Sequence, residues 1–202
     1  MHLVFDIFQG LGVAAAIGVR PFLPALVTGA LAAGGIELTF QHTKVHFLQQ
    51  PVFLIVMVVA IILLALVERR MTGIKGKLAG RPLAIVLGLC AVVLGALFCG
   101  GAFAHYHHGR HHMLWIGVVI GIVSALLGVA ATQPLLVRVR ARLDAEAGGV
   151  LPFVADGVAA LAAALSVVAP PVGVIVVLAL LWLLIAGRGR SDRKYAGLRI
   201  LR

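Results

Sequence analysis

The sequence predicts an all-α membrane protein in which about six helices cross the bilayer. Of its 202 residues, 62% are hydrophobic and only 12% are charged, whereas about a quarter of the residues of a soluble domain are charged. Residues 51–67 and 82–104 contain no charged side chain, and each run is long enough for a helix to cross about 30 Å of hydrocarbon. These observations exclude a soluble globular domain and a disordered chain.

Apolar segments follow one another along the chain, and together they form a single integral membrane domain over residues 1–202. Its first half is expected at 1–104, its second half at 113–187, and a basic cytoplasmic tail at 188–202. The six segments are residues 3–35, 51–67, 82–104, 113–137, 150–169 and 171–187. The last five have the length of single membrane-spanning helices.

Basic residues gather at the ends of these segments. Residues 69–81, 138–142 and 188–202 hold 14 of the 17 Lys and Arg residues. Such groups keep their loops in the cytoplasm and contact anionic lipids, so topology explains the net charge of +10 without nucleic-acid binding. Alternation along the six segments then predicts a multi-pass protein of the cell inner (plasma) membrane with both termini in the cytoplasm.

The segment 3–35 is too long for one crossing and too short for two, because 33 residues form a helix of about 50 Å. Within it, Arg20 is followed by Pro21 and Pro24. Each proline lacks a backbone donor and clashes with the carbonyl four residues before it. We therefore expect a discontinuous helix or a re-entrant turn that faces protein or water, because lipid cannot satisfy the freed carbonyls. The alternative is a short interfacial helix before an ordinary span.

Two glycine motifs suggest an internal duplication. The sequence Gly-Val-Ala-Ala occurs at 12–15 and at 128–131, and a proline follows each copy. This match predicts a 3+3 inverted repeat in which the first and fourth segments cross in opposite directions. A competing match, between 51–56 and 171–176, pairs the second segment with the sixth. Small residues at spacing four in the first and fourth segments predict close helix packing, either within one chain or in a homodimer.

Charged side chains inside the apolar segments mark a candidate site, since each needs a partner, a water route or a function. The candidate substrate-binding residues are Arg20, Pro21, Pro24, Thr132, Gln133 and Asp156. A half-helix that begins at Phe22, together with the Arg20 guanidinium, would favour an anion. The alternative is that Arg20 pairs with Asp156 or caps the carbonyls freed by the prolines. Asp156 is then either a proton carrier or that counter-ion.

Histidines gather in the expected external loops. The candidate metal ligands are His105, His107, His108, His111 and His112. Imidazoles at this spacing bind transition metals and titrate near neutral pH, although a loop without Cys or carboxylate makes a poor structural zinc site. The alternative is a polar loop that rests at the level of the lipid head groups.

Enzyme signatures are absent from the sequence. It contains no HExxH, GxSxG, GxGxxG or P-loop pattern. Its 7 acidic residues are too few for a metal-dependent phosphotransfer site inside the membrane. Glu68, Asp144 and Glu146 are expected to offset the charge of the neighbouring arginines. We predict that the protein is not an enzyme and uses no cofactor.

Two short motifs point to a family. Residues 18–24, Gly-Val-Arg-Pro-Phe-Leu-Pro, and the tail 193–202, Arg-Lys-Tyr-Ala-Gly-Leu-Arg-Ile-Leu-Arg, resemble the bacterial membrane proteins of domain-of-unknown-function family 4126. The resemblance implies a membrane fold over essentially the whole chain, and it implies no activity, cofactor or catalytic residue. The histidine run departs from the family's pattern, which argues against a shared metal function.

The leading functional hypothesis is a small transporter or channel, acting alone or as a homodimer, whose pathway passes residues 20–24 and Pro134. Its expected cargo is an anion or an anionic lipid head group. Its expected partners are the lipid bilayer and the anionic lipids of the cytoplasmic face. One alternative is a non-transporting scaffold that anchors a partner through the basic loops and tail. Another is a metal-handling membrane protein that uses the external histidines.

Overall fold

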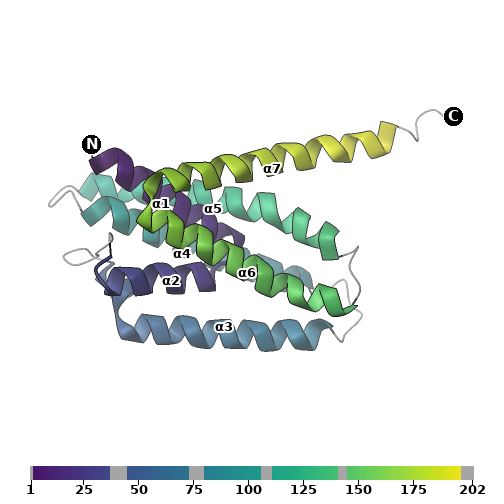
Figure 1. Cartoon of the computed structure of the whole chain (residues 1–202), viewed down its shortest axis with the longest axis horizontal. Helices are drawn as coiled ribbons and strands as arrows, with labels where there is room; N and C mark the ends of the chain where they lie inside the picture. The colour runs from purple at the N-terminus through teal and green to yellow at the C-terminus, as the bar shows by residue number, and fades with distance from the viewer. Residues whose placement is uncertain (1, 37–44, 73–79, 106–110, 141–144, 197–202) are drawn as a thin grey trace.

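The computed structural model is a bundle of long helices, which confirms the predicted polytopic helical fold (Figure 1). It describes residues 2–36, 45–72, 80–105, 111–140 and 145–196, and the side chains of 4–36, 45–68, 83–104, 114–139 and 150–187. The elements are α1 (His2–Val19), α2 (Phe22–Ala33), the 3-10 helix η1 (His46–Gln49), α3 (Pro51–Thr72), α4 (Gly80–His105), α5 (His111–Arg140), α6 (Ala145–Val168) and α7 (Pro170–Ala196). Helices α3 to α7 each contain an apolar stretch long enough to cross a membrane.

The first apolar segment is broken where its prolines predict. Helix α1 ends at Val19, and its last backbone hydrogen bond runs from the Arg20 amide to the Ala16 carbonyl at 3.3 Å. Pro21 caps α2, and Pro24 lies in the first turn of that helix, where a missing amide donor costs nothing. The prediction of a discontinuous helix is therefore confirmed.

Helix α2 turns back toward the end of the bundle from which α1 comes (Figure 1). The side-chain amide of Gln9 donates to the Val167 carbonyl at 2.8 Å, which places the start of α1 beside the junction of α6 and α7. In the second half of α2, Gly29 lies against the carbonyl of Leu48 in η1. Helix α2 ends at Ala33, and Gly35, two residues beyond it, has a φ of 69°, a left-handed conformation that favours glycine. Together α1 and α2 form a re-entrant hairpin.

The hairpin changes the predicted topology. We call the end of the bundle with His105, His111 and the α6–α7 junction the histidine end, and the opposite end, where α3, α5 and α7 finish, the basic end. Helix α2 has 12 residues and is about 18 Å long, too short to cross about 30 Å of hydrocarbon. Among the described residues, five helices are long and apolar enough to cross a membrane, whereas the sequence predicted six crossings. Helix α1 begins at the histidine end and α7 finishes at the basic end (Figure 1). This arrangement differs from the one behind the expectation that both termini share the cytoplasmic face, and the side of the membrane on which each terminus lies stays a prediction.

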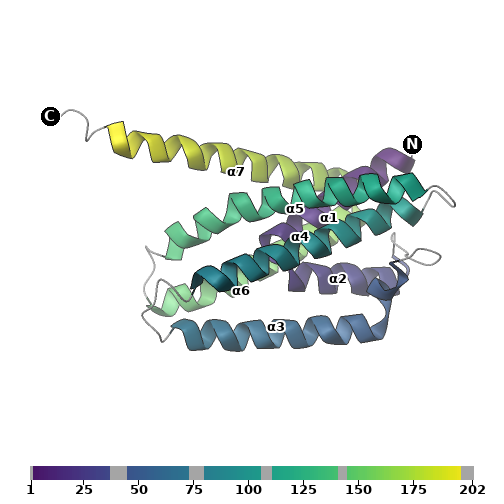
Figure 2. The same ribbon diagram turned by 180° about the vertical axis from the view of Figure 1, so that it is seen from behind.

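Helices α1 and α5 run in the same direction, which contradicts the antiparallel relation that the proposed inverted repeat requires. Gly10 and Gly117 both lie against Phe103 near the histidine end, and Gly18 lies against Ala125 and Gly128 farther along both helices. Helix α5 is also continuous through Pro134, with no counterpart of the break at Pro21. The glycine match between the first and fourth segments thus reflects packing. The segments 51–56 and 171–176 begin α3 and α7, which also run in the same direction (Figures 1 and 2).

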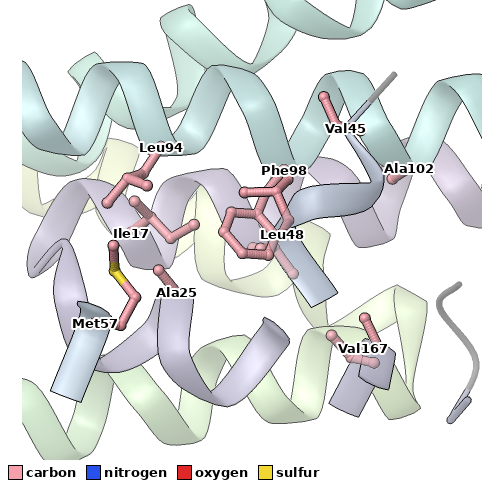
Figure 3. Packing of buried hydrophobic residues seen from close by; sticks show 11 residues of the cluster. Ile17, Ala25, Val45, Leu48, Met57, Leu94, Phe98, Ala102 and Val167 are labelled. Carbon is pink, nitrogen blue, oxygen red and sulfur yellow. The ribbon is translucent and has the colours of Figure 1, made fainter. Parts of the chain in front are cut away.

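The buried core lies around the hairpin, in the half of the bundle toward the histidine end. Ile17 of α1, Ala25 of α2, Met57 of α3 and Phe98 of α4 belong to one apolar cluster (Figure 3). Beyond the break, toward the basic end, the packing is looser. In the described part of α3 no side chain after Met57 is fully buried, and in that of α4 none is before Ala91. Helices α3 and α7 lie on opposite edges of the bundle (Figure 2).

The hairpin makes a prediction about the two ends of the chain. We expect an epitope at the N-terminus to be accessible from outside sealed spheroplasts and a green fluorescent protein at the C-terminus to fluoresce in the cytoplasm, because the basic end favours the inside. Antibody labelling and whole-cell fluorescence measure the two positions. If both ends are found on the same side of the membrane, α1 and α2 do not form a re-entrant hairpin in the bilayer.

Candidate functional site

Arg20 occupies the tip of the hairpin and is buried inside the bundle, with a side chain only 9% exposed. Its Nη1 donates to Glu68 Oε1 of α3 at 2.8 Å, which is a charge-assisted hydrogen bond of ordinary length. Its Nε lies 3.4 Å from Asp156 Oδ1 of α6. We call Arg20, Glu68 and Asp156 the charge triad. The hairpin, α3 and α6 are held to one another at this point.

The triad lies in the half of the bundle toward the basic end. Glu68 is about 25 Å along α3 from Pro51, and Asp156 is about 18 Å along α6 from Val168. The Glu68 side chain is 19% exposed and the Asp156 side chain is 22% exposed. The two carboxylates are therefore less buried than the guanidinium that they face.

The charges of the triad do not balance. One guanidinium faces two carboxylates, so the formal charge is one negative unit when all three groups are ionised. Hydrogen bonding is also uneven, because the buried Arg20 Nε has no hydrogen-bond partner although Asp156 Oδ1 is near. A second orphan polar atom on the same hairpin is the Thr28 hydroxyl oxygen of α2, which is fully buried. Each such atom carries an uncompensated desolvation cost.

The sequence did not predict the closest partner of Arg20. Glu68 stands directly before Arg69 and Arg70, and this neighbourhood suggested only that it offsets their charge. The sequence signal that could have identified Glu68 is its position directly at the end of an apolar run. The alternative prediction that Arg20 pairs with Asp156 agrees with the 3.4 Å separation.

The remaining predicted substrate-binding residues have other roles in the structure. Pro21 and Pro24 are buried and shape the hairpin. The Thr132 hydroxyl donates to the Gly128 carbonyl of its own helix at 2.6 Å, and the exposed Gln133 side chain donates to the Ala84 carbonyl of α4 at 3.3 Å. Gln133 therefore links α5 to α4, the Thr132 bond stays within α5, and Arg20 takes its charged partners from α3 and α6.

The candidate metal ligands lie outside the part of the chain whose side chains the structure describes, since His105, His107, His108, His111 and His112 all fall within 105–113. Within the described side chains, no group of three His, Cys, Asp or Glu residues is placed to hold a metal ion. Metal binding by the histidine run stays a prediction.

Comparison with known proteins finds no matching family model, no matching curated protein and no matching solved structure. The resemblance to domain-of-unknown-function family 4126 thus rests on its two sequence motifs alone. The charge triad is the structural feature that bears most directly on function.

Proposed function

We propose that the protein is a small membrane transporter whose pathway passes the tip of the re-entrant hairpin. The observation that carries this proposal is the charge triad, an Arg20 guanidinium buried at a helix break with two acidic partners on different helices. Ionisable groups at membrane depth are costly and are typical of ion and substrate pathways. Broken helices that face protein or a water-filled cavity are a recurrent element of such pathways.

The triad argues against the anionic cargo that the sequence suggested. Glu68 and Asp156 already occupy the guanidinium and leave the site with an excess negative charge. An anion would have to displace a carboxylate from Arg20 and would then meet repulsion from both acids. A cation, or a neutral solute moved together with a cation, suits this site better.

The half of the bundle toward the basic end provides the route to the triad. The side chains of α3 from residue 58 to 68 and of α4 from 83 to 90 are half-buried or exposed. The re-entrant hairpin reaches this half only with its tip at Arg20, whereas toward the histidine end it belongs to the core (Figure 1). We infer a state that is open toward the basic end. The charge pattern favours a cytoplasmic location for this end.

Electrophysiology on solid-supported membranes tests the proposal. Proteoliposomes are exposed to concentration jumps of protons, Na⁺, K⁺ and small organic cations, and we expect a charge displacement with at least one of them. Arg20→Ala and Arg20→Lys should lose most of that signal, because Lys cannot reproduce the two-sided geometry of the guanidinium. The matched control is Ser124→Ala, since that hydroxyl bonds only its own helix, to the Ile120 carbonyl at 2.9 Å. If the Arg20 variants give the same charge displacement as the wild type, the triad is not part of the pathway.

A non-transporting scaffold is the second candidate. The observation in its favour is that Arg20 is bonded within the protein, as a purely structural ion pair would be. A scaffold predicts a stoichiometric partner in cross-linking and no charge displacement in proteoliposomes. We further propose that the protein forms a homodimer, binds anionic lipids through its basic loops and handles metal through the histidine run. Calorimetry with zinc, nickel and copper tests the last of them.

A further inference from the structure

We infer that the charge triad binds and releases one proton, and that Asp156 is the carboxylate that carries it. The inference rests on the proposed transporter function, for which it names the coupling ion. It follows from three observations: the excess negative charge of the triad, the unequal bonding of its two acids, and the absence of further charged groups around it in the described part of the chain.

The three groups of the triad carry one more negative than positive formal charge, which one bound monovalent cation would balance. Unbalanced charge at membrane depth is unfavourable. A metal cation is a poor candidate, because no three potential ligands come together among the described residues and hard cations take about six or more oxygen ligands. A proton needs only one carboxylate oxygen.

The geometry distinguishes the two acids. Glu68 accepts a hydrogen bond of 2.8 Å from Arg20 Nη1, so it is the acid that the guanidinium holds directly. Asp156 lies 3.4 Å from Arg20 Nε, and this Nε makes no hydrogen bond. Glu68 therefore serves as the fixed counter-ion of Arg20, and the weakly bound Asp156 is free to exchange its proton. Deprotonation of Asp156 would strengthen its attraction to Arg20 and draw α6 toward the hairpin.

No other described charge competes for this role. Helix α6 packs mainly against α1, α2 and α7. Among the described side chains of the hairpin, the titratable ones are Arg20 and Asp6, and Asp6 lies near the histidine end at the far end of α1. The described side chains of α7, residues 170–187, include no titratable group, and those of α5 include only Arg138, whose guanidinium donates to the Gly187 carbonyl of α7. The proton exchange is thus a property of Asp156 with Arg20 and Glu68.

A hydrophobic carbodiimide tests the inference directly on the full-length protein in liposomes. Dicyclohexylcarbodiimide reacts with protonated carboxylic acids: the acid proton moves to a carbodiimide nitrogen, the carboxylate oxygen adds to the central carbon, and the adduct rearranges to a stable N-acylurea. Peptide mass spectrometry then locates the added mass. We expect the label on Asp156 in severalfold excess over Glu68, and we expect labelling to fall as the pH is raised.

The acid variants and the charge-displacement assay distinguish a failure of the proton site from a failure of the transporter proposal. Asp156→Asn should abolish the label and Glu68→Gln should retain it, while the wild-type peptide map gives the answer even if a variant does not fold. Label mainly on Glu68, or on neither acid at any pH, overturns the inference while leaving transport to be judged by charge displacement alone. Label on Asp156 without any charge displacement keeps the proton site and rejects the transporter.

Discussion

Arg20→Ala is expected to lower the free energy of unfolding by about 3–5 kcal/mol, because it leaves two acids without their counter-charge in a partly buried site. The loss should be visible in detergent as a shift of the SDS-induced unfolding transition followed by circular dichroism. Arg20→Lys should fall between Arg20→Ala and the wild type, since a lysine retains the charge but not the two-sided hydrogen bonding.

Asp156→Asn is the matched control for this prediction. It removes one charge and leaves the neutral pair of Arg20 and Glu68, so stability should change by about 1 kcal/mol or less. A triple variant, Arg20→Ala with Glu68→Gln and Asp156→Asn, should recover most of the stability that Arg20→Ala loses, because no unpaired charge remains. If Arg20→Ala unfolds like the wild type, the triad is not a buried ion pair in the membrane.

Gly173→Ala is expected to destabilise the protein by about 1–3 kcal/mol or to prevent folding, because the new methyl group would overlap the Phe8 carbonyl of α1. Gly12→Ala should behave similarly, since its methyl group would overlap Gly173 and Ser166. The added methyl groups would fit only if α1 moved away from α6 and α7. The SDS unfolding transition measures the effect.

Gly157→Ala is the control in α6, where an added methyl group has no neighbour within 4 Å. Alanine is a better helix former than glycine, so we expect this variant to gain up to about 1 kcal/mol. Equal losses at Gly157 and Gly173 would mean that the close approach of α1 and α7 does not set the outcome.

The helix break could be predicted because its cause is local. Pro21 and Pro24 act through their own missing amides and through clashes within one turn, and no distant contact is needed. The direction that the chain takes after the break could not be predicted, because no Lys or Arg fixes the side of residues 1–19. Counting the segment 3–35 as one crossing then predicted that the first helix begins at the end of the bundle where the last helix finishes, whereas α1 begins at the opposite end from the finish of α7.

The candidate site was predicted in part. A charged residue in an apolar run is visible in the sequence, which is why Arg20 and Asp156 were found. Glu68 was missed because its sequence neighbours are basic, while the residue that it bonds is 48 positions away. Helix packing brings the two together, and one sequence without an alignment holds no signal for such a pairing.

The repeat hypothesis failed for a different physical reason. Gly12 and Gly128 are the first residues of the matching motifs, and both lie at close helix contacts: Gly12 against Gly173, and Gly128 against Ala15 and Gly18. Membrane helices select small residues wherever backbones approach. Similar packing requirements therefore account for the two similar short sequences.

The position of α3 at the edge of the bundle has a mechanical consequence. Its first half is anchored by Met57 in the core, and its second half carries Glu68 but no fully buried side chain within 58–68. Weakening the bond to Arg20 would let this second half swing sideways about the anchored first half.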